Sequence, residues 1–184
     1  SEKEKLTEDI ERIIDKVRRE VERLNEENER LIREVRKRVE KLNRENKEAI
    51  KRVEEEVRRL RDRDKSDVRK KVEEAIRKLE RSVRESLKEV RRLIEELKRS
   101  VEETLREIER LAKELKDILD KVRTDGIDEE LVKRLEEKIR ELLKRARDLV
   151  KEDEDRIRKL LEEIERVNRD DKRKIDKLLE EVRR

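Results

Sequence analysis

Apolar residues recur every three or four positions along almost the whole chain, which is the spacing of one face of an α-helix. Two short segments interrupt this spacing and leave three long periodic stretches. The pattern predicts helices over about residues 2–63, 67–123 and 128–183 of the 184 residues. The chain is therefore expected to be all-α.

The pattern repeats every 18 residues. The stretch VERLNEEN at residues 21–28 returns as VEKLNREN at residues 39–46, and Ile139, Ile157 and Ile175 share the same spacing. Eighteen residues complete five turns at 3.6 residues per turn, so the apolar stripe stays parallel to the helix axis. A seven-residue repeat would instead impose a left-handed supercoil. We therefore expect long straight helices in an untwisted coiled coil.

The second interruption has clear turn chemistry. Residues 124–126 read Thr-Asp-Gly, and Gly126 is the residue type that adopts the left-handed conformation after a helix at low cost. Asp128 follows as a good N-cap, and two glutamates after it favour the positive end of a helix dipole. These signals predict a tight turn between two helices.

The first interruption, residues 61–67, contains neither Gly nor Pro, so one helix continuing through it is an alternative. At 100° per residue, however, the apolar stripes before and after the segment point roughly 80° apart. Asp64, Ser66 and Asp67 are also good N-caps. The phase favours a turn near residues 64–66.

Two turns and three stripes predict a single domain over residues 1–184, an up-down-up antiparallel three-helix bundle. Some positions that the periodicity assigns to its core are polar. These candidate structural residues are Asn28, Ser100, Thr104 and Asp153, and then Asn46, Ser82, Ser86 and Asp171.

The residue numbers group these positions into two layers. In two antiparallel helices, residues at the same height have numbers of constant sum. Asn28 with Ser100 and Asn46 with Ser82 have the same sum, whose midpoint falls at residue 64. Pairing the two serines with Asp153 and Asp171 places the other midpoint beside Gly126. Both midpoints coincide with the turns, so each layer is expected to join all three helices.

The chemistry within each layer is complementary, because a carboxylate accepts hydrogen bonds while amide and hydroxyl groups donate them. We expect each aspartate to accept from the amide and hydroxyl groups of its layer. Such layers would fix the helix register against slips between repetitive apolar layers. One carboxylate per layer, without His, falls short of the ligand sets of metal sites in helical bundles, so no metal is expected.

Composition narrows the function classes further. The chain has no His, Cys or aromatic residue, and 62% of its residues are charged. It therefore lacks the usual bases and nucleophiles of enzymes and the stacking platforms of single-strand binders. Positive and negative residues alternate, no apolar run could span a membrane and no targeting signal is recognisable. We expect no enzymatic activity, no cofactor, and neither nucleic acid nor membrane as a partner.

The 18-residue repeat, the aliphatic core positions and the nearly exclusive Glu, Lys and Arg surface resemble de novo designed, parametrically generated helical bundles. The polar layers resemble designed hydrogen-bond networks. The resemblance covers the whole chain and implies an untwisted, stable scaffold without an evolved function. Spectrin-like repeats are the natural alternative, but they usually have aromatic cores. The competing hypothesis is an assembly component, such as an oligomer subunit or a cage that presents a helix to a partner.

Overall fold

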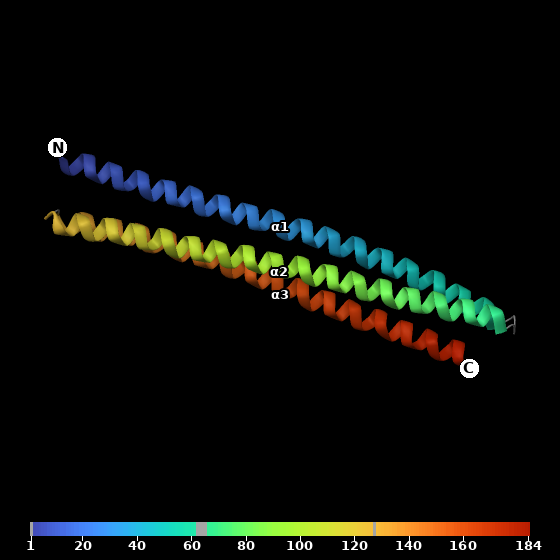
Figure 1. The fold of residues 1–184 in the computed structure, drawn as a ribbon. Helices are drawn as coiled ribbons and strands as arrows, with labels where there is room; N and C mark the ends of the chain where they lie inside the picture. The colour runs from blue at the N-terminus through green and yellow to red at the C-terminus, as the bar shows by residue number, and fades with distance from the viewer. Residues whose placement is uncertain (1, 62–65, 127) are drawn as a thin grey trace. The chain divides into compact units, whose positions relative to one another are not determined.

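The computed structural model describes residues 2–61, 66–126 and 128–184 and contains three long helices within them. Helix α1 is Glu2–Arg61, α2 is Ser66–Thr124 and α3 is Glu129–Arg183 (Figure 1). Their ends lie within two residues of those expected from the periodicity. The all-α class is confirmed.

The chain reverses direction between α1 and α2. Ser86 on α2 contacts Asn46 on α1, although 40 residues separate them. One continuous helix would hold these residues about 60 Å apart at 1.5 Å per residue. The continuous-helix alternative is therefore wrong, and the predicted turn near residues 64–66 lies largely outside the described residues.

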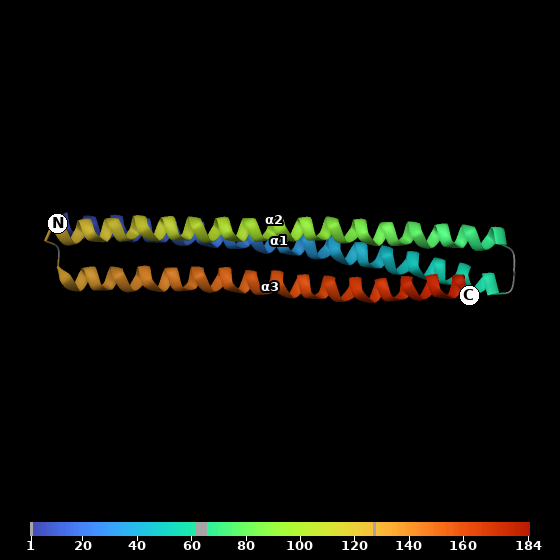
Figure 2. The same cartoon turned by 60° about the horizontal axis from the view of Figure 1, so that its bottom comes forward.

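The helices divide into two compact units, Ser1–Ile32 with Leu97–Arg156, and Arg33–Glu96 with Ile157–Arg184. Below, these are called the first and the second unit. Each unit holds one segment of every helix, and the three segments lie alongside one another (Figures 1 and 2). The single domain over the whole chain stays a prediction.

Ion pairs in the first unit give the helix directions. Lys138 binds Glu11 at 3.1 Å, and Arg156 binds Glu29 at 3.3 Å. Both pairs join α1 to α3 over the same separation of 127 residues, which only parallel helices produce. With α2 antiparallel to both, the fold is an up-down-up three-helix bundle.

The core of each unit is aliphatic and follows the predicted stripes. In the second unit, one helix turn after another contributes a side chain that is less than a tenth exposed. This cluster comprises Ile50, Val53, Val57, Val72, Ile76, Leu79, Val83, Ile175, Leu178 and Val182. Burial of such side chains is the main stabilising contribution to each unit.

One apolar residue with the spacing of the predicted stripe lies outside the core. The three- or four-residue spacing includes Ile13 in the stripe of α1, but Ile13 is 36% exposed, whereas Ile14 is 1% exposed. At 100° per residue, position 13 lies roughly 70° from the centre of the stripe. A residue at that angle covers the flank of the helix and does not reach the core.

The turn between α2 and α3 has the predicted geometry. Gly126 has a φ of 72°, and its amide donates to the carbonyl oxygen of Arg123. The Asp128 carboxylate accepts from the amide of Glu130 at 3.3 Å, which confirms it as the N-cap of α3. This turn fixes the position of the first residues of α3 along α2.

Candidate functional site

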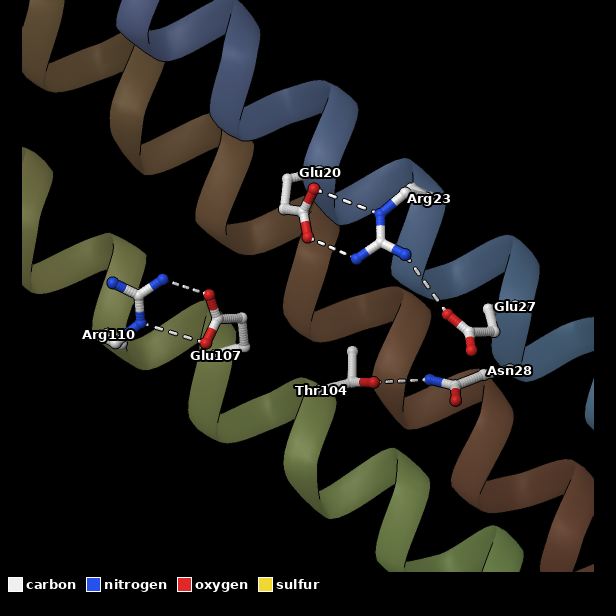
Figure 3. Close-up of polar contacts among 7 residues, drawn as sticks. All are labelled: Glu20, Arg23, Glu27, Asn28, Thr104, Glu107 and Arg110. Atoms are coloured by element: carbon white, nitrogen blue, oxygen red, sulfur yellow. Dashed lines mark hydrogen bonds and ion pairs between the residues drawn. The ribbon is translucent and has the colours of Figure 1, made fainter.

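Asn28 is the centre of a hydrogen-bonded group in the core of the first unit. Its side chain is 2% exposed and points from α1 towards α2 (Figure 3). Asn28 Nδ2 donates to Thr104 Oγ1 at 2.8 Å, and Ser100 Oγ donates to Asn28 Oδ1 at 2.7 Å. Both ends of the amide are therefore satisfied by side chains of α2.

The two hydroxyl groups on α2 are fixed in turn. Thr104 Oγ1 donates to the carbonyl oxygen of Ser100 at 3.0 Å, one helical turn earlier. This bond orients the lone pairs of Thr104 towards Asn28. Each of the two hydroxyl hydrogens therefore has an acceptor within the group.

Asp153 occupies the predicted height but not the predicted role. Its carboxylate is 1% exposed, and its Oδ1 accepts from Arg156 Nη1 at 3.3 Å. Its Oδ2 has no hydrogen-bond partner among the described residues. The expected bond between Asp153 and the amide and hydroxyl groups is wrong. The hydroxyl hydrogens of Ser100 and Thr104 are donated elsewhere, and Arg156 binds Asp153 from the next turn of α3.

The surroundings of Asp153 disfavour its charged form. Burial raises the pKa of this carboxyl group to about 6, although the Arg156 guanidinium lowers it. Glu29 and Glu152 add to the rise in the pKa, because each brings a second negative charge close. Since this carboxyl group is buried in the first layer, the charge within that layer changes as the pH passes through about 6.

The second layer lies in the second unit and is held less tightly. Asn46 is 7% exposed, and its Oδ1 lies 3.5 Å from Ser86 Oγ. Ser86 Oγ also donates to the carbonyl oxygen of Ser82 at 2.9 Å. One hydroxyl hydrogen cannot serve both acceptors, so the shorter bond to Ser82 leaves Asn46 with a long contact.

The Ser82 side chain is not in the second layer. It is exposed, and the residue takes part only through its backbone carbonyl. Position 82 lies roughly 80° from the centre of the α2 stripe at 100° per residue, whereas position 86 lies roughly 40° away. The equal sums of residue numbers fixed the height of Ser82 but not its direction.

Asp171 on α3 completes the set of predicted residues. Its side chain is 8% exposed, and burial raises the pKa of its carboxyl group. Lys174 lowers this pKa and Asp170 raises it. Asp171 lines a small cavity together with Asn46 and Ser86, so the three helices meet there through polar side chains.

Ion pairs cover the exposed flanks around the first layer (Figure 3). Arg23 on α1 binds Glu20 at 2.6 Å and Glu27 at 3.4 Å, and Arg110 on α2 binds Glu107. The hydrogen bond from Arg23 lowers the pKa of Glu20. These exposed pairs add little stability, but they keep the flanks polar.

Neither a metal-binding cluster nor a membrane span is found in the described part of the chain. Among these residues, no three His, Cys, Asp or Glu side chains gather closely enough to hold a metal ion. None of the three helices, as far as they are described, is apolar enough over a sufficient length to cross a membrane. The polar layers are the feature that requires a functional explanation.

No protein-family model and no curated protein matches the sequence. A solved structure described as a computationally designed three-helix bundle is similar to this chain, with 18% sequence identity and a TM-score of 0.55. The match covers 99% of this chain and 87% of that one. At this identity the likeness shows the three-helix fold alone.

Proposed function

We propose that this chain is a designed structural scaffold whose buried polar layers set the register of its helices. The observation that carries the proposal is the Asn28 amide, which is 2% exposed and bonded at both ends to Ser100 and Thr104. A buried amide satisfied by two side chains of one partner helix has a single favourable position against that helix.

A slip between helices illustrates how the layer would act. If α1 moved by one turn along α2, Asn28 would lie opposite Val101 or Ile108, which flank Thr104 in the stripe. Neither side chain offers a donor or an acceptor. The stranded amide would cost about 1–3 kcal/mol, while the aliphatic contacts would be largely regained by their neighbours in the repeat. The polar layer therefore favours the original register over the shifted one, whereas the apolar packing favours neither.

The scaffold function also fits the chemistry of the chain. Apart from the two polar layers, the core consists of Val, Ile, Leu and Ala, which offer packing and no reactive group. The similar solved structure is itself described as computationally designed, which supports the same origin for this chain. We propose accordingly that the protein is not an enzyme and needs neither a cofactor nor a metal.

An assembly component is the second candidate. It is favoured by a groove of about 550 Å³ between α2 and α3 in the first unit. Its apolar lining consists of Ala112, Leu119, Ile139 and Leu143, and the other lining residues are charged. A helix of a second chain in this groove would cover the half-buried Ala112 and Leu143, and the core would then be shared between chains.

Light scattering over a wide range of concentrations separates the two candidates. The scaffold function predicts a constant mass of 22.8 kDa, the mass of one chain. Filling the groove with the variant Ala112→Ile should then leave the mass unchanged. The scaffold proposal would be wrong if the original chain had a multiple of this mass and Ala112→Ile reduced it to the mass of one chain. That result would favour the assembly component.

A further inference from the structure

The second polar layer contains a cavity of about 20 Å³ in the second unit. A buried water needs roughly 10–15 Å³ of such volume and two to four polar partners. This cavity is partly open to solvent, and its volume has room for one water molecule. Its lining residues come from all three helices.

Polar groups converge on this space from three directions. Asn46 on α1, Ser86 on α2 and Asp171 on α3 line it, and so do Asn43 on α1 and Asn168 on α3. The remaining lining residues are aliphatic, among them Leu42, Val83 and Ile164. A water molecule in this position would meet acceptors and donors on three helices.

The hydrogen bonds around the cavity leave these groups available. Ser86 uses its hydroxyl hydrogen on the carbonyl of Ser82 at 2.9 Å, so its oxygen can accept. Asn46 Oδ1 lies 3.5 Å from Ser86 Oγ, a long contact for a hydrogen bond. The buried Asp171 carboxylate accepts hydrogen bonds when it is ionised. One water can donate to two of these oxygens and accept from an amide.

The 18-residue repeat explains why the space lies in the second layer. Ser86 occupies the position that Thr104 holds 18 residues later, and Asn168 occupies the position that Val150 holds 18 residues earlier. Compared with the first layer, the second layer therefore lacks the methyl group of Thr104. It also has the amide of Asn168 where the first layer has the isopropyl group of Val150. In the first layer, Thr104 lies 2.8 Å from the amide nitrogen of Asn28.

We propose that this cavity is a binding site for a single structural water molecule, which links Asn46, Ser86 and Asp171. The water joins the layer side chains of α1 and α3 directly, whereas in the first layer Asn28 is bonded to α2 at both ends and Arg156 links Asp153 to Glu29. The site does not depend on the scaffold function, since the bonds of Asn28 are the same with or without this water.

High-resolution crystal structures of the full chain and of two variants test the site. We expect one ordered water within hydrogen-bonding distance of Asn46, Ser86 and Asp171 in the original chain. Ser86→Thr adds a methyl group at the cavity and should expel this water. Ser82→Thr adds the same group one turn earlier on the exposed face and should leave the water in place.

A second measurement keeps the test independent of crystals. Magnetisation transfer in solution from a water to the side-chain amide of Asn46 should be observed, should persist in Ser82→Thr and should be lost in Ser86→Thr. The proposal fails if the density contains no water there while other ordered waters are visible, or if the transfer is absent. It also fails if Ser86→Thr retains the water.

Discussion

Asn28 Nδ2 on α1 lies 2.8 Å from Thr104 Oγ1 on α2, and 76 residues separate the two along the chain. Asn28 is 2% exposed and Thr104 is 5% exposed, so neither group can turn to solvent for a partner. The bond therefore ties one position of α1 to one position of α2.

Removing one partner of this bond should be costly. Thr104→Val keeps the shape of the side chain but strands the Asn28 amide, and we expect a loss of about 1–3 kcal/mol in the free energy of unfolding. Asn28→Leu together with Thr104→Val should cost less than the two single changes added together. A double-mutant cycle measured by denaturant unfolding gives this coupling, and additive losses would mean that the bond contributes nothing.

Replacing Asp153 with Leu should stabilise the protein at neutral pH. Its Oδ2 is buried without a partner, so ionisation there is opposed by desolvation and by Glu29. Removing such a charge is expected to add about 1–4 kcal/mol to the free energy of unfolding. The control Asp148→Leu changes an exposed aspartate of the same helix. A loss of stability in Asp153→Leu would mean that the carboxylate is bonded within the layer.

Asp153 should also make stability depend on pH. Its pKa rises from 3.8 to about 6 in the folded chain, so the folded state binds the proton more tightly. Its stabilising contribution is complete below pH 3.8 and is lost as the pH rises through about 6. The span of this change is about 3 kcal/mol at most, from about 1.4 kcal/mol per pKa unit.

Thermal unfolding across this pH window measures the effect. Asp153→Asn should flatten the profile there, apart from the part that Asp171 contributes in the same direction, since burial raises its pKa as well. An unchanged profile in Asp153→Asn would assign the pH dependence to other groups.

Filling the groove of the first unit should stabilise the chain. Ala112 holds the place that Ile76 and Ile94 hold in the same repeat, and both isoleucines are 0% exposed. Ala112→Ile should add about 1 kcal/mol to the free energy of unfolding, because its extra carbons would be partly buried. The reverse change Ile94→Ala should cost about 2–5 kcal/mol. Calorimetry checks both, and a destabilised Ala112→Ile would mean that the flanking helices cannot accept the side chain.

The turn between α2 and α3 gives a prediction about backbone conformation alone. A Cβ atom at Gly126 would meet no atom within 4 Å, yet the φ of 72° disfavours side chains other than those of Gly and Asn. Gly126→Val should therefore lower the melting temperature, while Gly126→Asn should have a smaller effect. Equal melting temperatures for both variants would contradict this.

The sequence predicts the large features because they follow from a regular period. Three stripes and the caps at Gly126 and Asp128 define the helices, and the equal sums of residue numbers place Asn28 opposite Ser100 from the sequence alone. Height along a helix is well determined by residue number, since each residue advances the axis by about 1.5 Å.

Direction around a helix and choice of partner are less well determined. Ser82 and Ser86 differ by roughly 40° around the axis, which decides whether the side chain is exposed or lines the cavity. Arg156 reaches back to Asp153 because its long side chain can bend towards the previous turn. Periodicity contains no information on such competition between donors.

A distance distribution between spin labels at Lys37 and Arg77 tests most directly whether the polar layers fix the register of the helices. Both positions are exposed and belong to the second unit, on α1 and α2. They lie at different heights, so a slip of one turn, about 5.4 Å, changes their separation. The original chain should give one narrow distance. A variant in which all buried polar residues are replaced by Leu, Val or Ala should give a broad or multiple distribution. An equally narrow distribution in that variant would contradict the claim and assign the register to the turns and the aliphatic packing.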